Sequence, residues 1–264
     1  MSDVAICHDI AAKAPLRGLA ALLDHDAPPW REGEVPPLGH WLYFLPDAPQ
    51  SGMGADGHPL RGDAYVHAFP RRMWAGGRIR FESPIPIGSR LERSSRTLAS
   101  RRKTGRSGEM MLVTIEHRIS ANGILAVVEE QDLVYRGPAS SPAPAEPPLG
   151  RTEASPASAR IFLPDEIALF RFSALTFNAH RIHYDRCYAR ECEGYPDLVV
   201  HGPLLATLLV DRRLRDEPGA RLASFAFRAE RPAFCGQELA LLRDGDSLSV
   251  LVAGQVAMRA EAST

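Results

Sequence analysis

The part of the chain with the greatest capacity for chemistry holds two histidines between apolar residues. Residues 172–185 read FSALTFNAHRIHYD, so that Asn178, His180, His183 and Asp185 follow one another closely. Histidine is the side chain whose pKa best suits proton transfer near neutral pH, and amide and carboxylate groups can orient it or hold a water molecule. The grouping indicates an acid–base site; histidines that only make structural hydrogen bonds in a loop are the alternative.

A helix start follows this segment. His201 and Gly202 precede PLLATLLVDRRL at residues 203–214, and proline is favoured at the first position of a helix. Backbone N–H groups in the first turn lack intrahelical partners and lie at the positive end of the helix dipole. Because Gly202 has no side chain to block approach, we expect a polarised oxygen, such as a carbonyl that becomes an enolate, to bind there.

Both features need a scaffold, and the sequence predicts an antiparallel sheet around a buried helix. The first two turns of residues 203–214 are apolar on all sides, so other structure must surround them. Asn122-Gly123 predicts a tight hairpin turn between two strands. Strand patterns occupy residues 90–102, 109–120, 124–136, 222–230, 238–243, 248–253 and 256–261. We therefore predict an α+β fold.

Two similar segments indicate that the chain consists of two related halves. Residues 79–91, IRFESPIPIGSRL, and residues 227–239, FRAERPAFCGQEL, share five residues at a constant offset, beginning with Arg80 and Arg228. In both, a strand runs into a proline and then a turn that ends in glycine, a pattern typical of a strand-to-strand crossing. The match suggests a duplication, with chance similarity of two β-turn-β units as the alternative.

A stretch rich in Pro, Ala and Ser separates the halves, and it is too poor in large apolar side chains to form a core. In the first half, the helix expected at residues 65–75 is interrupted by Pro70. We interpret that half as a degenerate copy that forms walls of the site, with the chemistry in the other half. The predicted domains are residues 1–137, a linker at 138–159, and a catalytic domain at 160–264.

Composition argues against several classes of protein. With 31 basic and 32 acidic side chains, the formal net charge is −1, so no overall field attracts nucleic acid or an acidic membrane surface. The four cysteines show no pattern of a metal site or a disulfide framework, and charged residues interrupt any signal-peptide core near the N-terminus. No apolar run reaches the roughly 18–20 residues of a membrane span. We expect a cytoplasmic protein without nucleic-acid or membrane partners.

Residues 172–185 together with 195–209 resemble the MaoC-like hydratase/dehydratase superfamily. The chain is most similar to its hydroxyacyl-thioester dehydratase type 2 branch, which includes mesaconyl-C4-CoA and itaconyl-CoA hydratases. The resemblance implies a double hot-dog fold, in which two long antiparallel sheets are each wrapped around a helix, here with the N-terminal helix degenerate. Supporting segments are PLGHW at 37–41, PRRMWAGG at 70–77 and VEEQDLVYR at 128–136.

The superfamily motif D-x-N-P-x-H falls on residues 178–183, with three departures. Asn178 stands at the aspartate position, His180 at the asparagine and Arg181 at the proline, while His183 matches the histidine. Because an amide cannot accept a proton, the resemblance implies that His183 is the acid–base group and that Asn178 orients the water or hydroxyl group. It also implies that the Gly202 N–H binds the thioester carbonyl. Candidates for a supporting role are His180, Asp185 and His201.

The resemblance implies reversible hydration of an enoyl-CoA thioester without a metal or other cofactor. An acyl-CoA is then the expected partner, while monomer and homo-oligomer both stay open. If the acyl group is a C5 dicarboxylate, as in the conversion of mesaconyl-C4-CoA or itaconyl-CoA to citramalyl-CoA, its distal carboxylate needs a cation. Arg71, Arg72 and Arg181 are candidates for that carboxylate or for the phosphates of CoA.

Three other interpretations are left open by the sequence. One is a thioesterase on the same architecture, and another is a protein that binds acyl-CoA without turnover, with Asn178 as the relic of a lost aspartate. The third is a metal site built from His180, His183 and Asp185. Because the two histidines lack the i, i+4 helical spacing of zinc hydrolases, we expect no metal there.

Overall fold

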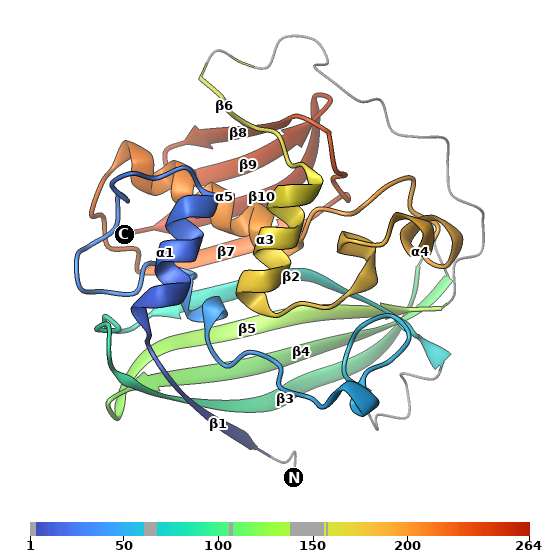
Figure 1. The fold of residues 1–264 in the computed structure, drawn as a ribbon, viewed down its shortest axis with the longest axis horizontal. Coiled ribbons are helices and arrows are strands. Elements are labelled where there is room, and N and C mark those ends of the chain that lie inside the picture. Colours follow the sequence, from blue (N-terminus) through green and yellow to red (C-terminus); the bar gives the residue numbers. More distant parts are fainter. Residues whose placement is uncertain (1–3, 61–67, 106–107, 138–155, 157) are drawn as a thin grey trace.

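The computed structural model describes residues 4–60, 68–105, 108–137, 156 and 158–264. Ten antiparallel strands form one curved sheet, with helices on its concave side (Figure 1). The strands are β1 (Ala5–Ile10), β2 (Arg71–Phe81), β3 (Arg90–Gly105), β4 (Gly108–Ala121), β5 (Ile124–Arg136), β6 (Arg160–Phe162), β7 (Ser224–Ala229), β8 (Leu239–Asp244), β9 (Ser247–Val252) and β10 (Gln255–Ser263). The helices are α1 (Lys13–Leu22), α3 (Glu166–Thr176), α4 (Arg186–Glu191) and α5 (Gly202–Asp216), with short 3-10 turns η1 (Gly39–Leu42), η2 (Gln50–Gly52) and η3 (Arg181–His183).

The sheet has two halves with the same strand order. From each outer edge inwards, the order is β1-β3-β4-β5-β2 in one half and β6-β8-β9-β10-β7 in the other. Each half therefore places its own first, third, fourth, fifth and second strands side by side. The two inner strands, β2 and β7, pair with each other at the centre. The two expected sheets are thus joined edge to edge, and the predicted α+β double hot-dog fold is confirmed.

The similarity between residues 79–91 and 227–239 matches this symmetry. The offset that relates Arg80 to Arg228 also relates Arg78 to Ala226, and Arg78 and Ala226 are direct partners in the register of β2 and β7. Two equivalent residues that face each other mark a local twofold relation between the halves. The domain boundaries stay predictions, since most of residues 138–159 lie outside the described part of the chain.

The strands follow the predicted segments closely because alternating and apolar patterns suit a sheet with one covered face. Every predicted strand is present, with ends that differ by at most a few residues. Between β4 and β5, Asn122 and Gly123 have φ of 50° and 83°, the left-handed conformation that a two-residue hairpin turn requires.

Helix α5 is the buried helix that the sequence predicts. It packs against β8, β9 and β10, and Figure 1 shows it inside the curve of these strands. Four leucines in its first two turns are no more than 2% exposed, and burial of each such side chain stabilises a protein by about 1.5–3 kcal/mol. They are Leu204, Leu205, Leu208 and Leu209. This packing fixes where the first turn of α5 lies relative to the sheet.

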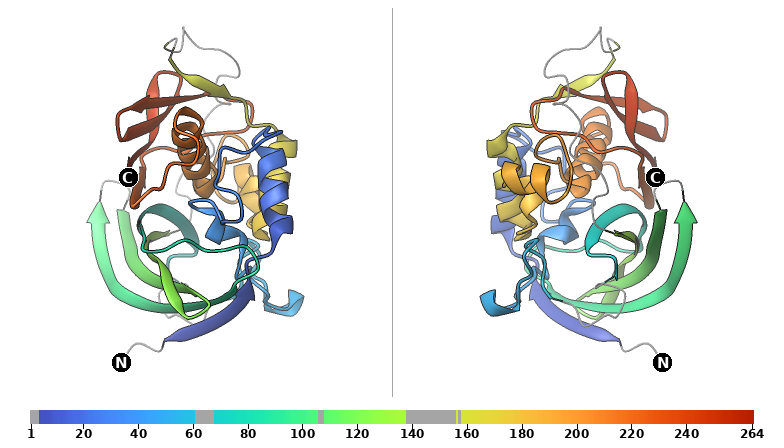
Figure 2. Two further views of the ribbon diagram at one scale, coloured as in Figure 1. Left: turned by 90° about the vertical axis from the view of Figure 1, so that its left-hand side faces the viewer. Right: turned by 90° about the vertical axis from the view of Figure 1, so that its right-hand side faces the viewer.

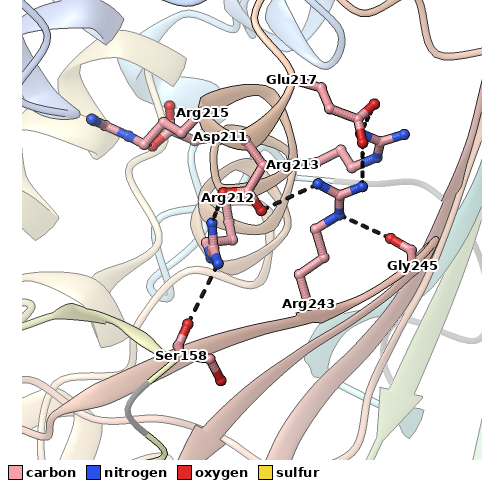
Figure 3. A network of polar contacts seen from close by, with 9 residues as sticks. Ser158, Asp211, Arg212, Arg213, Arg215, Glu217, Arg243 and Gly245 are labelled. Atoms are coloured by element: carbon pink, nitrogen blue, oxygen red, sulfur yellow. Dashed lines mark hydrogen bonds and ion pairs between the residues drawn. The ribbon is translucent and has the colours of Figure 1, made fainter.

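Ion pairs hold the C-terminal end of α5 (Figure 3). Arg243 of β8 donates hydrogen bonds to the Glu217 carboxylate at 2.5 Å and to the Gly245 carbonyl at 2.9 Å. Within the helix, Arg215 donates to Asp211 at 2.8 Å. Cationic groups near a helix C-terminus also interact favourably with the helix dipole. This end of α5 is therefore tied to the sheet by charge.

The N-terminal half has no helix that packs into its sheet as α5 does, within the residues that the structure describes. Residues 71–75 of the expected helix belong to β2, since Pro70 cannot continue a helical hydrogen-bond pattern. Residues 65–67 of that segment lie outside the described residues. Helix α1 of this half packs against α3 of the other half, and Figure 2 shows the two helices side by side. Among the described residues, no helix is both long and apolar enough to span a membrane.

Candidate active site

Helix α3 delivers the chain to the predicted acid–base segment. Asp165 caps its first turn by accepting a hydrogen bond from the Ala168 N–H at 2.7 Å, and Phe177 ends it in a left-handed conformation with φ of 47°. Asn178 comes next, and its Oδ1 accepts a hydrogen bond from the His180 N–H at 3.0 Å. The side-chain oxygen of Asn178 therefore holds the local backbone, and its NH₂ group can bind a ligand in the cavity that Asn178 lines.

His183 is buried and held in one tautomer. Its Nδ1 lies 2.7 Å from the Val199 carbonyl oxygen, which can only accept, so Nδ1 carries the proton. In the neutral ring, Nε2 then has a free lone pair, and His183 lines the cavity. Burial, together with the nearby rings of His201 and His180, lowers the pKa of His183 well below its usual value. The ring is therefore a neutral base at physiological pH.

His201, the residue just before α5, packs against the ring of His183. The rings of His201 and His183 stack with centroids 3.6 Å apart and planes inclined by 18°. His201 is fully buried, and its Nε2 lies 2.9 Å from the Ser173 hydroxyl of α3. Burial lowers the pKa of His201 to about 3, so the stacked rings are both neutral. His201 is thus a positioning residue and does not line the cavity.

The first turn of α5 opens onto the same cavity as His183. The cavity has a volume of about 1880 Å³ and is lined by residues of both halves, Gly202 among them. Within the described residues, the Gly202 N–H has no backbone acceptor. A Cβ at this position would approach the Trp74 carbonyl oxygen at 3.6 Å, so the backbone here is open on the cavity side. The structure therefore brings the predicted base and the predicted amide donor to one cavity.

The N-terminal half contributes a histidine that the sequence analysis missed. His58, from the loop after η2, lies against His180 with ring centroids 4.2 Å apart. Its Nδ1 donates to Asp56 Oδ2 at 2.8 Å, and burial, opposed by this bond, lowers the pKa of His58 to about 4. Although burial acts in the other direction, the hydrogen bonds from His58 lower the pKa of Asp56 to about 2. The only sequence signal is Asp56-Gly57-His58, a tripeptide typical of a turn stabilised by its aspartate.

Gly57 fixes this loop against the acid–base segment. Its φ is +88°, and a Cβ there would lie 1.8 Å from the Ala179 carbonyl oxygen, so only glycine fits. The Arg181 N–H also donates to the Asp56 carbonyl at 2.9 Å. The loop and the motif therefore form one packed unit across the two halves.

One group of side chains has the spacing of metal ligands. Asp56, His58 and His180 each offer a ligand atom within 4.8 Å of the other two. Both carboxylate oxygens of Asp56 already accept hydrogen bonds from His58, one from its backbone N–H at 3.0 Å and one from Nδ1. Asp56 and His58 are thus a hydrogen-bonded carboxylate–imidazole pair beside the ring of His180.

The arginines near the site differ in how far they are already paired. Arg71 donates to Glu193 at 2.6 Å and lies 5.5 Å from the ring centre of Tyr195. Arg72 lines the cavity and has partners of its own. Arg136, next to Arg71 in the register of β2 and β5, also lines the cavity, and its buried Nε has no hydrogen-bond partner among the described residues. The sequence analysis did not single out Arg136.

Arg181 and Asp185 have other roles than those predicted. Arg181 donates to Asp185 at 2.7 Å and to the Ala55 carbonyl at 3.0 Å, and Asp185 caps α4 by accepting from the Tyr188 N–H at 3.0 Å. Neither side chain lines the cavity. Asp185 is therefore not the partner of His183, whose Nδ1 is taken by Val199. The placement gives Arg181 no contact with a substrate in the cavity.

Two of the N-terminal segments that support the resemblance meet at a buried carboxylate. Glu129 accepts hydrogen bonds from His40 at 3.1 Å, Trp41 at 3.0 Å and Gln131 at 3.0 Å. Against the effect of burial, the hydrogen bond and charge of His40 lower the pKa of Glu129. All four residues line the cavity, so the N-terminal half forms a polar wall there.

Solved structures share this fold over nearly the whole chain. HtdX of Mycobacterium tuberculosis superposes with a TM-score of 0.68 at 16% identity and covers 99% of both chains. A MaoC-like dehydratase gives a TM-score of 0.72 at 14% identity, over 98% of this chain and 97% of the other.

Sequence comparisons place the chain more narrowly. The model of the family "hydroxyacyl-thioester dehydratase type 2" matches residues 37–235. Over 233 residues the chain is 46% identical to mesaconyl-C(4)-CoA hydratase of Chloroflexus aurantiacus, which covers 88% of this chain and 80% of that protein. It is 28% identical over 273 residues to the mitochondrial hydroxyacyl-thioester dehydratase type 2 of Schizosaccharomyces pombe, over 90% of this chain and 89% of that protein.

The chain has the hot-dog fold that the solved MaoC-like dehydratase structure also has. Among proteins of this fold, the chain belongs to the hydroxyacyl-thioester dehydratase type 2 family. It is accordingly a hydro-lyase that acts on a thioester.

Proposed function

We propose that this protein catalyses the reversible hydration of an enoyl-CoA, most readily a C5 dicarboxyl ester such as mesaconyl-C4-CoA or itaconyl-CoA, to a 3-hydroxyacyl-CoA such as citramalyl-CoA. One observation carries this proposal: His183, with its proton held on Nδ1 by Val199, lines the same cavity as the first turn of α5. Addition of water to a double bond conjugated with a thioester needs a base for the water and a donor for the carbonyl oxygen.

In the hydration of an ester such as mesaconyl-C4-CoA, whose double bond is conjugated with the thioester, the thioester oxygen accepts a hydrogen bond from the Gly202 N–H. His183 Nε2 takes one proton from a water molecule while the water oxygen bonds to the β carbon. The electron pair of the double bond moves towards the thioester oxygen, where the amide and the positive end of the helix dipole stabilise the enolate. His183 then returns the proton to the α carbon, so no cofactor is needed to balance the reaction.

Asn178 orients the water in this scheme. Its carbonyl oxygen is engaged with the His180 N–H, so its NH₂ group can donate to the water oxygen and direct a lone pair at the β carbon. An amide cannot take the proton, which leaves that step to an imidazole.

The preference for a dicarboxyl ester is supported by the cationic side of the cavity and by the mesaconyl-C(4)-CoA hydratase that is 46% identical to this chain. Arg71, Arg72 and Arg136 line the cavity, and Arg136 has an unpaired buried Nε among the described residues. Guanidinium groups bind carboxylates through parallel hydrogen bonds. We propose that Arg136 binds the distal carboxylate, with Arg71 and Arg72 beside it.

The experiment that tests the function follows the ultraviolet absorbance of the conjugated enoyl thioester. The purified protein is mixed with mesaconyl-C4-CoA, itaconyl-CoA, crotonyl-CoA and a longer enoyl-CoA, and the products are identified by mass spectrometry. We expect a mass gain of one water, fastest for the two dicarboxyl esters. Loss of absorbance should accompany it for mesaconyl-C4-CoA and the other esters whose double bond is conjugated with the thioester, whereas itaconyl-CoA, whose double bond is not, is followed by mass alone.

The same assay separates the other interpretations. Release of free CoA, detected with a thiol reagent, would identify a thioesterase. Saturable binding of the esters without any change in mass would identify a binding protein, and either result would contradict the proposed function.

A further inference from the structure

The reacting water in the proposed mechanism has two hydrogens, and His183 accepts only one of them. The residue at position 178, next to the water in the scheme above, is an amide and has no proton-accepting nitrogen. A second acceptor at this place would fix the orientation of the water and raise its nucleophilic character. Among the other described histidines that line the cavity, His58 has its Nδ1 bonded to a carboxylate and packs against the acid–base segment through His180.

We propose that His58, held by Asp56, is a second catalytic imidazole of this site and that it accepts a hydrogen bond from the reacting water opposite His183. The inference rests on the proposed hydration reaction. It means that the N-terminal half contributes directly to the chemistry as well as forming the walls of the cavity.

The tautomer of His58 suits this role. Its Nδ1 donates to the Asp56 carboxylate at 2.8 Å, so Nε2 has the free lone pair. The arrangement parallels that of His183, where the Val199 carbonyl takes the place of the carboxylate. A half-buried carboxylate hydrogen-bonded to the ring also stabilises any positive charge that develops on it, which a carbonyl does less well.

The position of His58 also suits this role. His58 and His183 both line the cavity, and the ring of His180 contacts both, at 4.2 Å from the centroid of His58 and 5.5 Å from that of His183. His180 itself is 5% exposed, and its Nε2 has no hydrogen-bond partner in the described structure. His180 thus packs against both rings, and all three residues line the cavity.

The loop that carries His58 is held firmly enough for a catalytic role. Gly57 packs directly on the Ala179 carbonyl, and the Arg181 N–H binds the Asp56 carbonyl. The same backbone segment, residues 179–181, leads into His183. Movement of the loop would therefore move the other catalytic histidine, which favours a fixed spacing between the two.

The proposed step is balanced. In hydration, the water oxygen bonds to the β carbon, one O–H proton moves to His183 Nε2, and the other stays on the new hydroxyl group and points to His58 Nε2. The π electron pair moves to the thioester oxygen, and the proton on His183 then bonds to the α carbon. In dehydration, His58 accepts the hydrogen bond of the substrate hydroxyl until it leaves as water.

The test uses three substitutions in the full chain, with the best substrate of the enoyl-CoA panel. His58→Asn keeps a donor for Asp56 but removes Nε2, and we expect kcat to fall by about 10²-fold with KM nearly unchanged. His58→Gln places an amide oxygen near the position of Nε2 and should restore part of the rate. Asp56→Asn should lower kcat less than His58→Asn, because the ring stays but its tautomer is no longer fixed.

A control and a rescue experiment distinguish chemistry from folding. Arg243→Gln, at the far end of α5 and outside the cavity lining, should keep the wild-type kcat within about twofold. His58→Gly leaves a space for added imidazole, which should increase the rate of this variant and not of Arg243→Gln.

Wild-type kcat in His58→Asn, a change in KM alone, or a loss of rate that neither imidazole nor His58→Gln reverses would overturn the inference. If the wild-type protein hydrates no ester of the panel, the proposed function itself is wrong, and the inference fails with it. Turnover by the wild type together with full activity of His58→Asn would overturn only the inference.

Discussion

The N-terminal end of α5 lies beside neutral imidazoles, whereas its C-terminal end lies beside ion-paired guanidinium groups. His183 and His201 stack beside the first turn, and both have lowered pKa values. At the other end, Arg243 and Arg215 bind carboxylates that lie within a few residues of the helix terminus (Figure 3).

The two ends of the helix dipole therefore have different roles, stabilisation of the fold at the C-terminal end and binding of a ligand at the N-terminal end. At the C-terminal end, positive side chains complement the dipole and stabilise the packed helix. At the N-terminal end, carboxylates would complement it in the same way, but none caps the helix: His201 precedes it and makes no side-chain cap. The backbone amides are therefore left for a ligand. Five predictions test this contrast, from the largest expected effect to the smallest.

Replacement of His183 should have the largest effect on activity. His183→Ala removes the nitrogen that takes the proton of water, and kcat should fall by about 10²–10⁴-fold in the steady-state hydration assay. Arg243→Gln, at the far end of α5, should leave kcat within about twofold of the wild type, since its partners lie outside the cavity. Near-wild-type turnover of His183→Ala would show that the two ends do not differ in this way.

Gly202→Ala tests the free amide without removing it. A Cβ here meets only the Trp74 carbonyl at 3.6 Å, an ordinary contact, so the fold should be retained. The added methyl group stands where the thioester oxygen approaches, and a misplacement of about 1 Å can cost about 10²-fold in kcat/KM. A circular dichroism melt checks the fold, and unchanged kcat/KM would contradict binding of the carbonyl at this amide.

Arg136→Gln should act on substrate choice. Loss of a charged hydrogen bond of about 1.5–3 kcal/mol should raise KM for mesaconyl-C4-CoA or itaconyl-CoA by roughly 10- to 100-fold. The KM for crotonyl-CoA, which has no distal carboxylate, should change little. Equal effects on both kinds of ester would instead place Arg136 at the CoA moiety.

The free energy of unfolding should depend on pH through two histidines, His201 just before α5 and His58 in the loop after η2. The pKa of His58 is about 4 and that of His201 about 3, both below the value near 6.5 of an unfolded chain. The unfolded state therefore binds more protons below about pH 6.5, and the free energy of unfolding should fall as the pH drops from there towards about 4.

Urea titrations at about pH 7.5 and about pH 5 measure this slope. Arg243→Gln should lower the free energy of unfolding by roughly 0.2–1 kcal/mol at both pH values, because arginine stays charged throughout. A stability that does not vary over this range would contradict the neutral state of the buried rings.

Chelation should have no effect on turnover. In the proposed reaction no step passes through a metal ion, and both carboxylate oxygens of Asp56 accept hydrogen bonds from His58. Dialysis against EDTA followed by the hydration assay should return the wild-type kcat, with metal content checked by mass spectrometry. A rate that falls on chelation and returns with one divalent ion would assign a metal to the group of Asp56, His58 and His180.

The sequence predicts helices and strands whose apolar residues recur with a regular spacing, and it predicts contacts between residues that are close together along the chain. The alternating segments 124–136 and 256–261 became strands, and the apolar run at 203–214 became α5. His183 and Gly202 are linked by a short segment, so their meeting at one cavity was foreseeable.

Contacts between distant loops were not foreseeable in the same way. Asp56 and His58 lie in a loop without periodicity, and only the close approach of Gly57 to Ala179 shows where that loop lies. Asp185 looked like a partner for His183, but a carbonyl oxygen, that of Val199, took this place. Any residue can provide a carbonyl, so residue type gives no signal for such a partner.

Where β2 meets β7, arginine at position 78 faces alanine at position 226, although the two positions are equivalent. In an assembly of two identical subunits, every group at such an axis must occur twice, and both clefts must carry the same chemistry. A single polypeptide is free of that restriction. The C-terminal half contains the proton-transfer segment, residues 178–183, and the N-terminal half contains the loop that carries His58. A ligand with two chemically different ends can therefore bind two different surfaces.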